Sequence, residues 1–199
     1  MIKSSLSLLV LVSVAVSTVS ARAASVFTSQ AGFISTLQPG YYTETFSNPA
    51  ANPNAPLASK TITAAPFSYT IAGAASGLYE DSAIIGNWAP SQELVITFTA
   101  GNITAVGGEF FLSDVNGNFQ SAPVTITMND GTVETWTPSG VSSFRGFTSP
   151  GVTITSLTVG VAATRFNNID NLIVGVAVPE PSGLLLVLGG LLPMFRRRR

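Results

Sequence analysis

Short runs of threonine, valine, isoleucine and phenylalanine fill residues 25 to 178, and each run is soon broken by asparagine, aspartate, glycine or proline. The first kind of residue favours extended strands, and the second kind favours turns. This spacing predicts strands at residues 42–46, 67–72, 94–98, 103–112, 124–128, 132–136, 144–147, 152–161 and 169–176. Many short strands in one domain predict an all-β fold, a two-sheet antiparallel sandwich or jelly roll.

One short helix is expected before the first of these strands. Residues 29–37 fit a helix, with Thr28 or Ser29 placed to cap it and Pro39 and Gly40 placed to end it. Residues 48–56 are rich in asparagine and proline, so we expect a loop there rather than a linker between domains.

Composition excludes several classes of function for residues 24–177. Three basic residues against nine acidic ones give this region a net charge of −6, which argues against nucleic-acid binding. The chain has no histidine and no cysteine, which excludes Ser-His-Asp catalysis and the usual zinc sites. Only oxygen ligands remain for a metal ion, and these favour calcium.

Residues 1–23 have the three parts of a secretory signal peptide. Lys3 gives the positive start, residues 6–19 form the apolar segment, and Ala21, Arg22 and Ala23 form a small-x-small cleavage site. We therefore expect a helical leader that signal peptidase removes, leaving residues 24–177 as an exported β-sandwich domain. An uncleaved N-terminal membrane anchor is the alternative, although the apolar run is short for it.

The C-terminal 22 residues form a second distinct segment. An extended motif comes first, then an apolar stretch at residues 183–195, then a basic cluster. Thirteen apolar residues make a helix of about 20 Å, shorter than the roughly 30 Å of a bilayer core, so temporary retention is favoured over an ordinary tail anchor. The motif is Val178, Pro179, Glu180, Pro181 and Ser182; the retention segment and basic stop include Gly183, Leu184, Leu185, Leu186, Phe195, Arg196, Arg197, Arg198 and Arg199.

These three parts, in this order and at the end of the chain, resemble the PEP-CTERM sorting signal of Gram-negative bacteria. The resemblance covers residues 178–199 and implies recognition of Pro179, Glu180 and Pro181 by a membrane-embedded exosortase, with cleavage nearby. It further implies a transient stay at the inner membrane and a final place at the cell surface or in an exopolysaccharide or biofilm matrix. The expected partners are the exosortase, signal peptidase and exopolysaccharide.

Trp136 is a candidate glycan contact. If Asp130 and Gly131 form a two-residue type I′ hairpin turn, Thr125 lies opposite Trp136, and the tryptophan points away from the aliphatic face of its strand. An outward tryptophan beside threonines suits stacking against a sugar. The alternative is that Trp136 covers a sheet edge or packs under a loop.

Two carboxylates fall on apolar faces of predicted strands. Alternation places Glu44 with Phe46 and Asp170 with Leu172. A structural calcium bridging Glu44 and Asp170 would satisfy both groups, in loose resemblance to carbohydrate-binding jelly rolls. The alternative is hydrogen bonding at strand ends or pairing with an arginine.

Two other acidic motifs have simpler interpretations. The alternating oxygens that begin at Asp114 resemble the start of a calcium loop but lack its closing glutamate, so an Asx turn is favoured. Glu80 and Asp81 are adjacent and point to opposite faces of a strand, which argues against a catalytic pair.

The hypothesis favoured by the sequence is an exported, non-catalytic cell-surface or matrix protein with no required cofactor. A lectin-like carbohydrate-binding module is the first alternative. A polysaccharide-acting enzyme is the second, and it would draw a carboxylate pair from Glu44, Glu80, Asp81, Glu109, Glu134 and Asp170.

Overall fold

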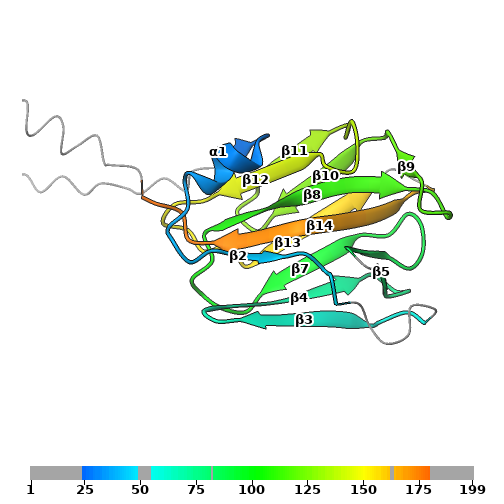
Figure 1. Ribbon diagram of the computed structural model, residues 1–199, viewed down its shortest axis with the longest axis horizontal. Helices are drawn as coiled ribbons and strands as arrows, with labels where there is room; N and C mark the ends of the chain where they lie inside the picture. The colour runs from blue at the N-terminus through cyan, green and yellow to red at the C-terminus, as the bar shows by residue number, and fades with distance from the viewer. Residues whose placement is uncertain (1–23, 49–54, 82, 162–163, 180–199) are drawn as a thin grey trace, which may run out of the picture.

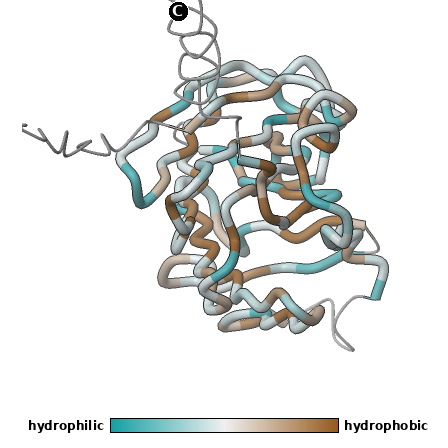
Figure 2. Tube along the Cα trace, turned by 90° about the vertical axis from the view of Figure 1, so that its left-hand side faces the viewer, coloured by the Kyte–Doolittle hydropathy of each residue, from teal (hydrophilic) through white to brown (hydrophobic). Residues whose placement is uncertain are grey.

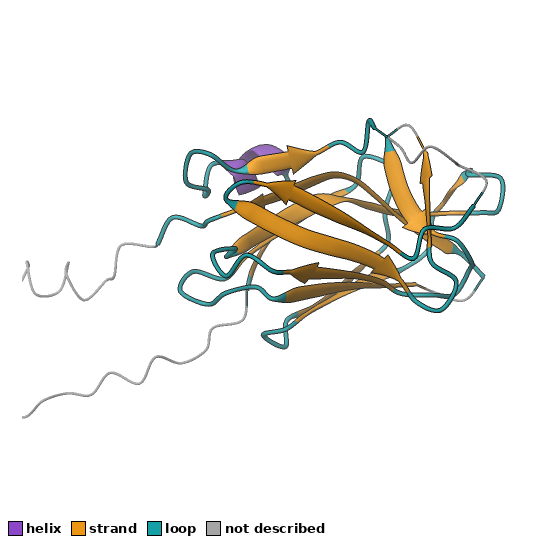
Figure 3. Ribbon diagram, turned by 90° about the horizontal axis from the view of Figure 1, so that it is seen from below, coloured by secondary structure: helices purple, strands orange, loops and turns teal. Residues whose placement is uncertain are grey.

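The computed structural model describes residues 24–48, 55–81, 83–161 and 164–179. The predicted leader, residues 180–199 of the sorting signal and most of the asparagine- and proline-rich loop lie outside the described residues. Within them, two antiparallel sheets pack face to face (Figures 1 and 3). The prediction of an all-β sandwich is confirmed.

The first layer, sheet A, has eight strands in the described part of the chain. Its strand order is β1-β12-β8-β14-β6-β5, with β2 also paired to β14 and β9 to β8. The bounds are β1 Ser25–Phe27, β2 Tyr42–Glu44, β5 Leu78–Asp81, β6 Ile84–Asn87, β8 Ala105–Ser113, β9 Phe119–Gln120, β12 Phe144–Thr148 and β14 Phe166–Gly175.

The second layer, sheet B, has six strands in the order β11-β10-β13-β7-β4-β3. The bounds are β3 Ser59–Ala64, β4 Phe67–Gly73, β7 Leu94–Phe98, β10 Val124–Met128, β11 Val133–Trp136 and β13 Ser156–Val161. The predicted bounds of β7 and β10 are confirmed, and most other predicted strands are shifted by one to four residues at an end. Strands β1, β3, β5, β6 and β9 were not predicted.

The core lies between the sheets, where the apolar residues of alternating strands meet. Tyr69, Phe46, Phe110 and Phe147 are among its largest fully buried side chains. Hydrophobic stretches run through the interior of the trace, and hydrophilic ones gather at its turns (Figure 2). The alternation that the sequence predicts is thus the alternation between core and solvent.

Helix α1 (Gln30–Ile34) covers one end of the outer face of sheet A, the face turned away from sheet B (Figure 1). Ser29 caps it by accepting a hydrogen bond from the N–H of Gly32, as predicted. Phe33 is fully buried against Gly107 and Gly146 of sheet A, because neither glycine has a side chain that would fill the space. The helix is shorter than predicted.

The two described ends of the chain meet beside this helix. Ser25, Thr148, Ala105 and Gly175 form one register row across β1, β12, β8 and β14. The N–H of Val178 then donates to the carbonyl of Thr36, just after α1, at 2.8 Å. We call the end of the sandwich beside α1 the helix end. The opposite end, where β8 stops and β14 starts, is called the groove end, after the groove described below.

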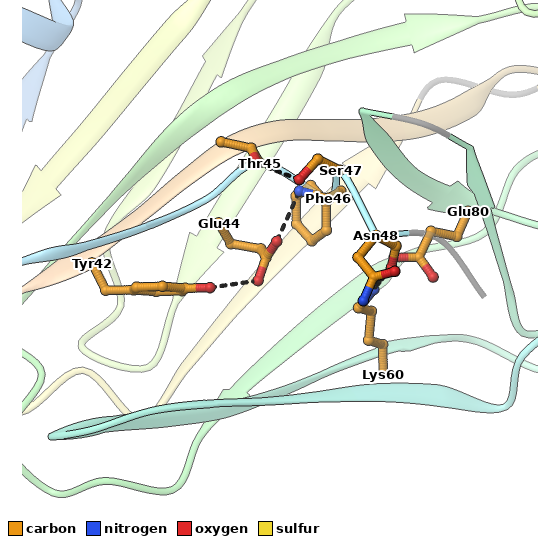
Figure 4. Close-up of polar contacts among 8 residues, drawn as sticks. All are labelled: Tyr42, Glu44, Thr45, Phe46, Ser47, Asn48, Lys60 and Glu80. Atoms are coloured by element: carbon orange, nitrogen blue, oxygen red, sulfur yellow. Dashed lines mark hydrogen bonds and ion pairs between the residues drawn. The ribbon is translucent and has the colours of Figure 1, made fainter. Parts of the chain in front are cut away.

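Ion pairs join the two sheets along both of their open sides. Lys60 of edge strand β3 pairs with Glu80 of edge strand β5 and also donates to the carbonyl of Asn48 (Figure 4). On the other side, Nε of Arg145 in β12 lies 3.5 Å from Oε1 of Glu134 in edge strand β11. Two of the three cations of residues 24–177 therefore hold the layers together.

Candidate functional site

A groove of about 550 Å³ opens on the outer face of sheet A at the groove end. Strands β5 and β6, the start of β14 and the loop after β8 line it. Tyr79, Trp88 and Phe166 bring three aromatic rings to the lining, and Asp81 and Asp114 bring two carboxylates. This combination of rings and acceptors makes the groove the candidate binding site.

Tyr79 is held in one position on the sheet. Its ring lies over Gly86, where any side chain would collide with it. The Tyr79 hydroxyl donates to Oδ1 of Asn168, and Nδ2 of Asn168 donates to Oγ of Ser113 at 2.9 Å and to the carbonyl of Phe166 at 3.1 Å. Because Asn168 is fully buried and bonded on both sides, the aromatic floor of the groove is preorganised.

The Tyr79 hydroxyl keeps its proton throughout the neutral range. Burial raises the pKa of Tyr79 to about 12, and the nearby charge of Asp81 adds to this, while a hydrogen bond with Ser113 opposes it. The groove therefore has a neutral phenol in its floor rather than a phenolate or a general base.

Trp88 forms the exposed wall of the groove. It follows β6 directly, and 37% of its surface is exposed, while its backbone N–H donates to the carbonyl of Gly77 at 3.0 Å. Val115 also lines the groove and is 81% exposed. Two exposed apolar side chains beside a polar rim mark a surface suited to binding.

The loop that begins at Asp114 forms another part of the lining. Oδ1 of Asp114 accepts hydrogen bonds from the N–H groups of Asn116 (2.9 Å) and Asn118 (3.0 Å), and Oδ2 accepts from the side-chain amides of Asn118 (3.2 Å) and Gln120 (3.4 Å). These bonds, led by that of the Asn118 side chain, lower the pKa of Asp114. The predicted Asx turn is confirmed, and it fixes the loop.

The hairpin that places Trp136 differs from its prediction. Gly131 has a φ of +87° while Asp130 has a negative φ, and Met128 pairs with Thr132. The loop therefore has three residues instead of two, and the register moves by one, so that Val124 rather than Thr125 lies opposite Trp136.

This one-residue change turns Trp136 to the core side of sheet B. Only 8% of its surface is exposed, its ring meets Phe110 edge-on at 6.3 Å, and the guanidinium of Arg145 lies 4.6 Å from the ring centroid. Trp136 also borders a cavity of about 500 Å³, which Thr137 and residues 139–143 line as well. The prediction that Trp136 points outward as a surface for stacking is wrong, and the alternative of burial near a sheet edge is confirmed.

Glu44 faces inward, as predicted, beside Tyr42 and Phe46 (Figure 4). Its carboxylate accepts hydrogen bonds from the Tyr42 hydroxyl and from the N–H of Phe46, both at 2.8 Å. Burial, followed by the bond to Glu44, raises the pKa of Tyr42 to about 12. The alternative of strand-end hydrogen bonding is confirmed for this residue.

Asp170 lies on the other face of sheet A from the predicted one. A β-bulge follows it, with Asn171 in the left-handed region at a φ of +48°, and this extra residue breaks the alternation with Leu172. Asp170 instead lies directly opposite Glu109 on the outer face. The structure therefore does not bring Glu44 and Asp170 together, and the described residues contain no group of three or more metal-ligating side chains.

Replacing Asp170 with asparagine is expected to raise stability at neutral pH. Partial burial raises the pKa of Asp170 and the charge of Glu109 adds to this, partly offset by the N–H of Asn171. The folded state therefore holds this proton more tightly than the unfolded state, and stability falls as pH rises through the interval above the unfolded pKa. We expect the melting temperature of Asp170→Asn to exceed that of the native protein by about 1–3 °C at pH 7.

The same comparison at low pH tests the cause. Below the unfolded pKa the native aspartate is protonated in both states, so the difference between Asp170→Asn and the native protein should vanish. Asp114→Asn is the opposite control, because the lowered pKa of Asp114 gives stability at neutral pH that is lost on acidification. If Asp170→Asn melts at a lower temperature than the native protein at pH 7, this would contradict the inference that the Asp170 charge destabilises the fold.

The remaining acidic candidates for catalysis do not gather in the groove. Glu109 and Asp170 are cross-strand neighbours, but they do not line the groove. Glu80 and Glu134 form the two cross-sheet ion pairs, and Asp81 lies in the groove lining. No two of the six candidate carboxylates share the described groove.

Comparison with protein-family models finds no matching family, and comparison with curated proteins finds no relative. Among the described residues, no helix has the length and apolar character needed to cross a bilayer. Fold and groove together define the class of the molecule: an all-β, two-sheet antiparallel sandwich with an aromatic groove at one end.

Proposed function

We propose that the chain is an exported, non-catalytic protein of the cell surface or of an exopolysaccharide matrix, sorted through residues 178–199. The motifs at both ends of the sequence support this: a secretory leader at the start, and a Pro-Glu-Pro motif, a short apolar segment and an arginine cluster at the end. The domain between them contributes a binding groove.

The observation that carries the proposal is the way the chain leaves the sandwich. Strand β14 ends at Gly175, Ala177 forms an isolated bridge with Leu37, and Val178 is 50% exposed. Pro179, the first residue of the Pro-Glu-Pro motif, is exposed too. Pro179 therefore lies exposed where the packed fold stops, and this position supports access by a processing enzyme.

Intact-mass analysis of the protein recovered from the producing cells tests the proposal. We expect a mature chain that has lost residues 1–23 and ends near residues 179–182. The variant Glu180→Ala should keep its C-terminal tail and stay in the membrane fraction, whereas Gln38→Ala, an exposed change outside the motif, should be processed normally. A mature native chain that retains Arg196 to Arg199 would contradict sorting and favour an ordinary membrane anchor.

A further inference from the structure

We propose that the groove at the end opposite the sorting segment binds an uncharged polysaccharide, with a sugar ring stacked on Trp88. The inference goes beyond the proposed function, because it assigns a site and a class of ligand that sorting alone does not require. It rests on the shape, charge and hydrogen-bonding character of the groove lining.

The aromatic rings favour a ligand with flat apolar faces. Trp88 is the exposed ring, Phe166 is half-buried, and Tyr79 is fixed below them by Asn168. The C–H face of a pyranose ring covers such a surface, and the preorganised floor requires little ordering when the ligand arrives. A cavity of about 550 Å³ is within the usual size range of ligand sites.

The charge of the groove selects against acidic polymers. Its lining includes the carboxylates of Asp81 and Asp114 and no lysine or arginine. Residues 24–177 as a whole have a net charge of −6. Arg165, just before Phe166, acts on Asp114 but does not line the groove, so two carboxylates against one nearby cation leave the local charge negative. A uronate or sulfate group would meet repulsion there, which favours an uncharged ligand.

The lining also favours a ligand that donates hydrogen bonds. The carboxylates of Asp81 and Asp114 carry acceptor atoms only, and Asn116, exposed at the rim, adds an amide oxygen that can accept from hydroxyl groups. A proline-rich peptide would also stack on aromatic rings, but its backbone offers mainly carbonyl acceptors and lacks N–H donors at proline. The hydroxyl-rich surface of a neutral polysaccharide matches this lining better.

The position of the groove is compatible with binding while the tail is retained. Ser113 and Phe166 stand at the groove end, and Ala105 and Gly175 stand eight or nine residues away at the helix end, about 27 Å along the strands. A chain held by its C-terminal segment would therefore present the groove on the far side of the domain.

Affinity gel electrophoresis of the mature protein from the producing cells tests the inference. The gels contain soluble β-glucan, mannan or dextran as neutral polymers, or alginate as an acidic one. We expect retardation by at least one neutral polymer and none by alginate. Trp88→Ala should weaken the retardation about tenfold, and Trp88→Phe should keep part of it, because a flat ring remains.

Tyr41→Ala is the matched control. Tyr41 is 38% exposed, nearly the same as Trp88, but it lies by the helix end next to Gly175. This variant should bind within about twofold of the native protein, and melting curves of all variants should verify folding. Binding to no neutral polymer, equal loss in Tyr41→Ala, or preference for alginate would overturn the assignment. The mass test of sorting is unaffected by any of these results.

Discussion

The Lys60→Met variant is expected to unfold with a free energy about 3 kcal/mol lower than that of the native protein. Methionine keeps most of the packing of the lysine stem but removes the ammonium that pairs with Glu80 across the two sheets. Glu80 is only 3% exposed, so its charge stays in the interior after the change without its cation. Removing one partner of a buried ion pair costs more than the intact pair contributes, because the remaining carboxylate loses its cation in the interior.

Chemical denaturation of a small set of variants separates the loss of the ion pair from the cost of the buried Glu80 charge. The double variant Lys60→Met/Glu80→Leu should recover much of the lost stability, because it removes the buried charge as well. Thr63→Ala, on the exposed face of the same strand, should change stability by about 0.5 kcal/mol or less. If Lys60→Met costs no more than this control, the ion pair does not hold the open side of the sandwich.

The second large effect is expected at Gly146, where one added methyl group should displace helix α1. A Cβ at this position would lie 2.6 Å from Cδ2 of Phe33 and 3.0 Å from Cε1 of Phe144. Phe33 is fully buried and must shift to make room, so Gly146→Ala should lower the free energy of unfolding by about 2 kcal/mol.

Gly140→Ala is the control for this change, because nothing lies within 4 Å of the added atom there. In limited proteolysis, residues 28–38 should be cleaved faster in Gly146→Ala than in the native protein, because the helix no longer packs closely against the sheet. Equal stability and equal cleavage in both glycine variants would show that the close contact of Phe33 with the sheet is not required.

The fold class could be predicted from the sequence because strand composition and turn residues are local signals. The positions of individual side chains could not, because they depend on single-residue events. One extra residue in the loop at Gly131 turned Trp136 inward, and one bulge at Asn171 moved Asp170 to the opposite face. Both events follow from backbone conformations with positive φ, which asparagine and glycine permit but do not require.

The groove was missed for a related reason. Its two flanking strands, β5 and β6, include Glu80, Asn87 and Gly86, so they lack the apolar alternation that reveals a strand. The buried Glu80 pairs with Lys60 of the other sheet, a contact between residues twenty positions apart. Without these strands, nothing in the sequence marks Trp88 as the exposed tryptophan and Trp136 as the buried one.

The attachment of the C-terminal segment to β14 has a mechanical consequence. This strand lies inside sheet A, with β8 along one side and β6 and β2 along the other (Figure 1). A pull on Pro179 acts along the length of β14, so its ladders with three neighbours carry the load in shear and must fail together. An edge strand pulled outward would open one hydrogen bond at a time. The domain is therefore connected to its C-terminal segment at a strand that is paired on both sides, which favours resistance to extraction by force.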